Sequence, residues 1–374
     1  MRIVIEAAWH ARSLPARLLR MCLVPFSLVF GLLVAFRNTL YDHGLLRVRR
    51  VTVPVVSVGN LRVGGTGKTP FVIWLVERLK SRGFRVAVVS RGYGADPSPT
   101  LICSRADAER IPSGLVSRRI IVEDAQEAAL DAADEALLVA MRTGVCVATG
   151  SDRYAACAIA EKACAPDVIV LDDGFQHRRL GRDVDVVLLG PDDRAARLLP
   201  AGPLRERASA LGRADVVIES ADSSARFRMK RTPAGIVRTV RRDAAIDSVE
   251  LLRGATVTAV SGVASNESFF SMLRSLGANL GQSYAFPDHH RYSVADWTRI
   301  AGGPETSRRV VTTEKDLVKL AAVARCDSRL CALRLELDVD GGEEMFALIC
   351  ARARLDARPR GQHDRRPRPS GVET

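Results

Sequence analysis

Residues 53–79 constrain the fold of this chain more than any other stretch. A β-branched run at 53–58 leads into a glycine-rich turn that ends in Lys68 and Thr69, and the residues after it are apolar at helical spacing. A strand, a glycine-rich loop and a helix in this order form a cradle for phosphate groups. The glycines let backbone N–H groups turn toward an anion, and the helix N-terminus adds partial positive charge. The stretch therefore predicts an α/β fold that binds a nucleoside triphosphate at the loop.

The loop differs from the common pattern G-x-x-x-x-G-K-[ST] at its first glycine, where this chain has Arg62. Gly64 and Gly65 supply the backbone freedom instead, as in the variant pattern G-G-x-G-K-[ST]. We expect Lys68 to reach the β- and γ-phosphates of ATP and the Thr69 hydroxyl to bind Mg²⁺. A glycine-rich turn that binds nothing is the alternative, which the order of strand, loop and helix disfavours. The predicted nucleotide-binding residues are Arg62, Val63, Gly64, Gly65, Thr66, Gly67, Lys68 and Thr69.

The charge of the chain limits its partners. Its 374 residues carry a formal net charge of +12, which favours nucleic acid, an anionic membrane or a phosphorylated substrate as partner. Only 5% of the residues are aromatic, and no stretch alternates basic and aromatic residues as single-strand binders do, so we expect no nucleic acid partner. The cysteines form no C-x-x-C pair, which disfavours a zinc site, and an ATP site indicates a reducing compartment.

A charge-free stretch at 21–36 lies near the N-terminus. It is shorter than the roughly 20 residues that span a bilayer as a helix. A signal peptide is disfavoured, because no small-x-small cleavage site follows and export would remove the loop from ATP. A buried core helix is the second interpretation, and a helix or hairpin that dips into the inner leaflet is the one that we favour. The arginines that flank the stretch and suit lipid phosphates are Arg12, Arg17, Arg20, Arg37, Arg47, Arg49 and Arg50.

Apolar strands alternate with helices after the loop, which predicts a parallel sheet covered on both faces. The predicted strands are 85–90, 145–149, 167–171, 184–189 and 216–218, the predicted helices are 124–141 and 152–164, and 96–112 is expected to be a loop. Beyond a more polar stretch, strands at 256–260, 282–286 and 310–312 and a helix at 267–276 predict a second α/β unit. We therefore expect a membrane-associated helical segment (1–50), a P-loop NTPase-type parallel sheet domain (51–220), a linker (221–240), a smaller α/β domain (241–353) and a disordered basic tail (354–374).

Two adjacent carboxylates, Asp172 and Asp173, end one of the predicted strands. We expect this strand to lie near the strand that precedes the loop, so that the carboxylates hold Mg²⁺ directly or through water. A turn rich in Asp and Gly is the alternative interpretation. Together with Thr69, Asp172 and Asp173 are the predicted metal ligands.

Several motifs together resemble one family, the tetraacyldisaccharide 4′-kinases. The motifs are Val-Gly-Gly-Thr-Gly-Lys-Thr-Pro at 63–70, Ser-Arg-Gly-Tyr-Gly at 90–94, Leu-Asp-Asp-Gly-Phe-Gln-His at 171–177, Leu-Pro-Ala-Gly-Pro-Leu-Arg-Glu at 199–206, Phe-Pro-Asp-His-His at 286–290 and Val-Thr-Thr-Glu-Lys-Asp at 311–316. The resemblance implies a kinase with two α/β domains that uses ATP and Mg²⁺ to phosphorylate the 4′-hydroxyl of a tetraacylated glucosamine disaccharide 1-phosphate. The product is lipid IVA, a lipid A precursor. It further implies a place on the cytoplasmic face of the bacterial inner membrane, against its lipid surface, and we expect a monomer.

The resemblance also implies the roles of individual residues. Asp134 is the expected catalytic base and His289 its orienting partner, with Lys68 as the third catalytic residue. The family motif Gly-Asp-Glu-Pro is here Ala133-Asp134-Glu135-Ala136, which keeps only the acidic pair. The sequence leaves open whether His289 or His290 is the catalytic histidine, and both are alternatively polar loop residues. The expected substrate and phosphate contacts are Arg153, Arg205, Gln176 and His177.

Two rival functions share part of this pattern. A membrane-bound ATPase switch carries a lysine just before the paired glycines, where this chain has Val63. A basic nucleic-acid-binding ATPase lacks support because aromatic residues are not interleaved with the basic ones. The lipid kinase is therefore the leading hypothesis.

Overall fold

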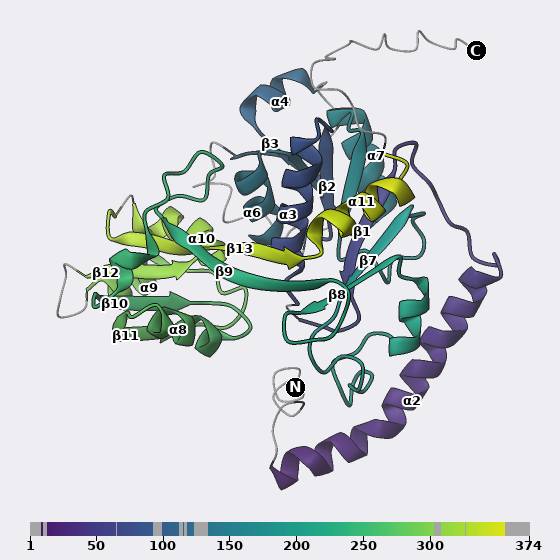
Figure 1. The fold of residues 1–374 in the computed structure, drawn as a ribbon, viewed down its shortest axis with the longest axis horizontal. Coiled ribbons are helices and arrows are strands. Elements are labelled where there is room, and N and C mark those ends of the chain that lie inside the picture. Colours follow the sequence, from purple (N-terminus) through teal and green to yellow (C-terminus); the bar gives the residue numbers. More distant parts are fainter. Residues whose placement is uncertain are drawn as a thin grey trace.

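The computed structural model describes residues 9, 13–64, 66–92, 99–111, 115, 118–122, 134–302, 308–325 and 327–355. Within them, the strands form one mixed sheet in the order β11-β10-β12-β13-β9-β8-β7-β1-β6-β2-β5-β3-β4, with helices on both faces (Figure 1). All of the expected basic tail beyond residue 355 lies outside the described residues.

The first half of the sheet is centred on β1, which lies between β6 and β7 and runs parallel to both. Its strands are β1 (Val55–Asn60), β2 (Val86–Ser90), β3 (Thr100–Cys103), β4 (Arg118–Ile121), β5 (Cys146–Thr149), β6 (Val168–Asp172), β7 (Val184–Leu188) and β8 (Val216–Ser220). The helices are α3 (Lys68–Ser81), α4 (Arg105–Arg110), α6 (Asp134–Thr143), α7 (Arg153–Cys164) and the 3₁₀ helix η2 (Ala208–Arg213).

The central strands are apolar along their whole length because both of their faces are covered. Every residue of β1, β2 and β6 is buried. Phe71 and Leu75 of α3 pack on one face of the sheet, and Ala156 and Cys157 of α7 belong to the core on the other face. Because β1, β2 and β6 are parallel, their carboxyl ends meet at one edge of the sheet, where α3 and α7 begin.

Two expectations about this half are wrong. The sheet is not wholly parallel, because β3 runs antiparallel to β5. The stretch 96–112 is not a loop throughout, because β3 and α4 occupy most of 100–110. A short strand such as β3 gives too few residues for a periodicity to be recognised, and its burial comes from its neighbours in the sheet.

The second half continues the same sheet. Its elements are β9 (Arg228–Val237), the 3₁₀ helix η3 (Val249–Leu252), β10 (Thr256–Ser261), α8 (Asn266–Ser275), β11 (Asn279–Ala285), α9 (Val294–Ala301), β12 (Arg309–Thr313), α10 (Glu314–Ala324), β13 (Leu330–Asp340) and α11 (Gly342–Arg352). The expected linker at 221–240 contains β9, which pairs with β8 and, antiparallel, with the long strand β13. The division into two domains stays a prediction.

The helix α2 (Leu14–Asp42) lies along the outside of the molecule (Figure 1). Its 29 residues far exceed the charge-free stretch, because Arg17, Arg20 and Arg37 on either side of that stretch are helical too. Within the described chain it is the one helix long and apolar enough to cross a membrane, judged by length and composition. It touches the body through small residues: the Ser27 hydroxyl donates to the Leu198 carbonyl at 3.0 Å, and a side chain on Gly31 would collide with Leu198.

Candidate active site

The glycine-rich loop follows β1 directly and leads into α3. Gly67 has φ +84°, a left-handed conformation that glycine adopts without strain, and it places Lys68 at the first position of α3. The buried Asn60, the last residue of β1, donates its side-chain amide to the Thr66 hydroxyl at 2.9 Å and to the Gly64 carbonyl at 3.3 Å. Asn60 thus fixes the curvature of the loop, a role that the sequence motif did not reveal.

The predicted loop residues differ in what their groups contact. The Arg62 guanidinium lies 3.2 Å from the buried carboxylate of Asp193, so it anchors the start of the loop. The Val63 N–H donates to the Pro203 carbonyl at 2.8 Å. Thr69 lies in the first turn of α3, and Gly65 lies outside the described residues.

The strand β6 brings the two adjacent carboxylates beside this loop. Asp172 is paired in register with Val58 of β1, which confirms that the two strands are neighbours. Asp173 has φ +56°, an uncommon conformation for a residue with a side chain, which the surrounding ion pairs hold. Its carboxylate lies 3.4 Å from the Lys68 ammonium and forms a two-pronged ion pair with the Arg205 guanidinium at 2.8 and 3.0 Å. The arginine fork predicted to contact phosphate therefore holds Asp173.

The electrostatics of the two carboxylates differ. Burial raises the pKa of Asp172 to about 7, against the lowering effect of Lys68. Burial also acts to raise the pKa of Asp173, but the hydrogen bonds and charges of Arg205 and Lys68 hold it well below its usual value. Asp173 is thus ionised, whereas Asp172 forms no ion pair among the residues that the structure describes.

Several buried polar atoms around this edge have no hydrogen-bond partner within the described residues. They are Asp172 Oδ1, Gln176 Oε1, His177 Nε2, Arg153 Nε and Arg205 Nε. Buried polar groups are nearly always satisfied in a folded protein, so such a set at one edge indicates a place for a polar ligand. A buried carboxylate oxygen without a partner fits a divalent cation, because Mg²⁺ prefers oxygen ligands.

The remaining predicted contact residues line the same edge. Arg153, the first residue of α7, is buried and donates to the Gly150 carbonyl at 2.8 Å. The Gln176 amide donates to the Asn60 carbonyl at 2.9 Å. Burial and the nearby Arg153 lower the pKa of His177 to about 4, so its imidazole is neutral at physiological pH.

Asp134 and His289 come together from opposite halves of the sheet. Asp134 begins α6, and His289 lies in the loop after β11 with φ +61°. The His289 Nδ1 atom is 3.2 Å from the Asp134 Oδ2 atom. The hydrogen bond to Asp134 raises the pKa of His289. His290 instead lies 3.2 Å from Asp296 and stacks on Phe286.

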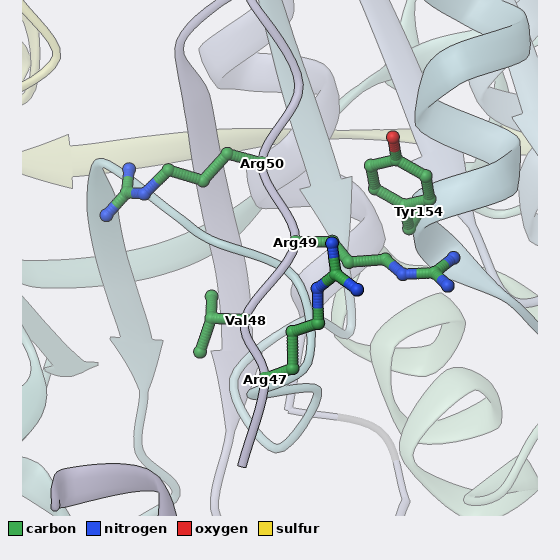
Figure 2. Close-up of a pocket in the computed structure, with 5 residues that line it drawn as sticks. All are labelled: Arg47, Val48, Arg49, Arg50 and Tyr154. Carbon is green, nitrogen blue, oxygen red and sulfur yellow. The ribbon is translucent and has the colours of Figure 1, made fainter. Parts of the chain in front are cut away.

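A basic hollow of about 460 Å³ lies just beyond the end of α2. Figure 2 shows Arg47, Arg49 and Arg50 along one extended stretch of the chain, with Tyr154 of α7 beside Arg49. The Arg49 guanidinium lies over the Tyr154 ring at 5.0 Å, and Arg50 is 3.6 Å from Asp183.

A model of a known protein family matches most of this chain. The model of the LpxK family, described as tetraacyldisaccharide-1-P 4′-kinase, matches residues 19–354 of this chain. The chain belongs to the LpxK family. This confirms the resemblance seen in the sequence motifs.

Relatives in the LpxK family match most of the chain. A protein named tetraacyldisaccharide 4′-kinase from Anaeromyxobacter sp. (strain Fw109-5) is 40% identical over 382 residues, which cover 95% of this chain and 98% of the relative. A protein of the same name from Pelobacter propionicus is 40% identical and covers 88% of this chain and 92% of its own length. The crystal structure of LpxK from Aquifex aeolicus in complex with ATP has a TM-score of 0.73 at 34% identity, covering 89% of this chain and 99% of that chain.

The structure of this LpxK-family chain also places residues at the site to which the sequence analysis gave no role. Lys315 and Lys319 of α10 and Glu135 of α6 surround Asp134 and His289. The spacing of the two lysines, i and i+4, puts both on one face of a helix. The sequence shows this spacing. It does not show that α10 lies beside α6, so the two lysines could not be assigned to Asp134 from the sequence.

Proposed function

We propose that this LpxK-family chain transfers the γ-phosphate of ATP to the 4′-hydroxyl of tetraacyldisaccharide 1-phosphate, a step of lipid A biosynthesis. The observation that carries the proposal is the hydrogen bond between Asp134 and His289. The pair lies near Asp172, whose pKa is raised mainly by burial and further by the charges of Asp173 and of Glu135, the residue next to Asp134. A base with an orienting partner beside a phosphate cradle is the arrangement that transfer to a sugar hydroxyl requires.

The proposed nucleotide site is the loop at 62–69. Backbone N–H groups of the loop and of the first turn of α3 bind the phosphates, and Lys68 moves from Asp173 to the β- and γ-phosphates. Thr69, Asp172 and Asp173 would hold Mg²⁺, which neutralises charge on the phosphate oxygens when bound. The unpartnered oxygen of Asp172 and its raised pKa support this assignment.

The proposed chemical step depends mainly on aligning the 4′-hydroxyl oxygen with the γ-phosphorus. Asp134 accepts a hydrogen bond from the 4′-hydroxyl and aims its oxygen at the γ-phosphorus. The O4′–P bond forms as the bond from the γ-phosphorus to the bridging oxygen of ADP breaks, and the hydroxyl proton passes to Asp134. His289 keeps the carboxylate ionised and correctly turned. Arg153, Gln176 and His177 line the side where the sugar and its phosphate bind.

The proposed place of work is the cytoplasmic face of the inner membrane. Leu28, Leu32, Leu33 and Phe36 of α2 are each more than half exposed, which is costly in water and favourable in lipid. The basic hollow of Figure 2 is lined by the chain just after α2 and suits phosphates of the lipid surface. Leu45, in the same stretch of chain, is also exposed.

The experiment that tests the function is transfer of radiolabel from γ-labelled ATP to tetraacyldisaccharide 1-phosphate in detergent micelles. We expect a labelled lipid with this acceptor and none with an acceptor that already carries a 4′-phosphate. Release of labelled inorganic phosphate without labelled lipid would contradict the proposal and favour an ATPase switch.

A further inference from the structure

We propose that Lys319 is a positioning residue for the transfer, because its ammonium group holds one oxygen of Asp134 so that the other oxygen faces the acceptor hydroxyl. The inference rests on the proposed function and extends it to a residue outside the Asp134–His289 pair.

Several contacts hold the ammonium group of Lys319 in one place. Its Nζ atom lies 3.2 Å from Asp134 Oδ2, donates to the His290 carbonyl at 3.0 Å and lies 3.4 Å from Asp316 Oδ1. The ammonium also lies 5.4 Å from the centre of the Tyr292 ring. The residue is 7% exposed. Burial of a lysine ammonium group is costly unless carboxylates and carbonyls surround it, as they do here.

Both partners of Asp134 lie at the same oxygen. His289 Nδ1 and Lys319 Nζ are each 3.2 Å from Oδ2. Within the described chain, Oδ1 of Asp134 makes no hydrogen bond. Two donors on one oxygen fix the rotation of the carboxylate, and the free oxygen is the one that can accept the hydroxyl hydrogen. One donor alone would leave the carboxylate free to swing.

The charges around the pair explain why a second cation is needed. Glu135 and Asp288 both pair with Lys315, at 2.8 and 3.0 Å, and Asp316 lies behind Lys319. Lys319 is therefore the ammonium group that separates the carboxylates of Asp134 and Asp316. Burial acts to raise the pKa of Asp134, but His289, Lys319 and Lys315 together hold it below its usual value.

The sign of the pH effect follows from these charges. With Lys319 in place, Asp134 stays ionised down to low pH. Without it, burial and the nearby Asp316, Glu135 and Asp288 favour the protonated form, so the pKa of Asp134 rises. A protonated Asp134 is no base, and the rate would begin to fall at a higher pH.

The test is the pH dependence of kcat in the radiolabel assay for Lys319→Met, which removes the charge but keeps the length of the side chain. We expect kcat at pH 7.5 to fall by about 10- to 100-fold. We expect KM for ATP to stay within about twofold and the midpoint of the acid limb to rise by at least about half a pH unit. Lys319→Arg should keep the acid limb near its wild-type midpoint, because the cation remains. Lys162→Met, on the exposed last turn of α7, is the matched control and should leave the profile unchanged.

Different outcomes separate the two proposals. Wild-type protein that transfers no label counts against the proposed function. Wild-type transfer, together with a Lys319→Met variant that is less stable but has the wild-type acid limb, would overturn the role of Lys319. If Lys319→Met does not fold, Lys319→Gln removes the same charge but keeps a hydrogen-bond donor, and the acid limb should still rise.

Discussion

At the scale of single residues, Lys68 is held by an ion pair beside the glycine-rich loop. The Lys68 ammonium lies 3.4 Å from the Asp173 carboxylate, which Arg205 also holds. In the proposed mechanism, Asp173 therefore keeps Arg205 as its partner when Lys68 moves to the phosphates.

We expect Lys68→Ala to lower kcat by about 10³-fold, because it removes charge that stabilises the migrating phosphoryl group. The fold should survive, since Asp173 remains paired with Arg205. The measurements are radiolabel transfer and a thermal melt. Lys80→Ala is the matched control. It removes a lysine from the last turn of the same helix, about 18 Å from Lys68, and it should affect the melting temperature more than the rate. Near-normal turnover in Lys68→Ala would mean that the loop is not the phosphate site.

The residue scale also shows what the sequence could predict at the site. Asp172, Asp173, Asp134 and His289 belong to motifs whose residue types suggest chemistry. The structure pairs Asp173 with Arg205 and Asp134 with His289, and it places Asp172 beside β1. The sequence could not show that Arg205 binds Asp173, because the partner of a long side chain depends on the folded path of the chain. The catalytic roles of Asp172, Asp173, Asp134 and His289 stay predictions.

At the scale of elements, local signals predicted much of the secondary structure. The helix α7 begins where Asp152 was expected to open it, and the Asp152 carboxylate accepts the N–H groups of Tyr154 and Ala155. Short elements such as β3 and α4 were not predicted. They contain too few residues to show a periodicity, and their neighbours in the fold decide their burial. The length of α2 was underestimated because charged residues at a helix end do not stop the helix.

We expect the exposed face of α2 to hold the protein on membranes. Replacing Leu28 and Leu32 with Asn removes two apolar side chains, each worth about 1.5–3 kcal/mol when buried in an apolar phase, so vesicle binding should fall at least about tenfold. Both side chains are more than half exposed, so the melting temperature should change little. The measurement is co-sedimentation with vesicles that contain anionic lipid.

The arginines after α2 allow an electrostatic control on the same vesicles. Arg47→Gln with Arg49→Gln should weaken binding to anionic vesicles by about 1 kcal/mol per charge and leave binding to neutral vesicles unchanged. High salt should weaken the wild type in the same way. Binding unaffected by both sets of substitutions would place the membrane contact on another surface.

At the scale of the whole molecule, the site depends on how the two halves of the sheet are held. The apolar core under α3 and α6 continues to α10 and α11, so the halves share buried side chains. Arg142 of α6 and Glu314 of α10 add an ion pair at 2.5 Å. This packing keeps α6 beside α10, and it brings the carboxylate of one half to the histidine of the other.

The double-mutant cycle of Asp134 and His289 tests whether this contact acts as one unit. The two side chains are 3.2 Å apart across the two halves, and His289 both turns the carboxylate and favours its ionised form. Residues that work as a unit are strongly non-additive. Asp134→Ala and His289→Ala should each lower kcat strongly, and the double variant should be little worse than the less active single variant. KM for ATP should barely change, because the proposed roles of both side chains concern the acceptor hydroxyl and not the nucleotide. Arg142→Ala and Glu314→Ala form the matched cycle across the same halves, where we expect coupling in the free energy of unfolding. Fully multiplicative losses of kcat for Asp134 and His289 would show that the two residues do separate jobs, and the pair would not be a catalytic dyad.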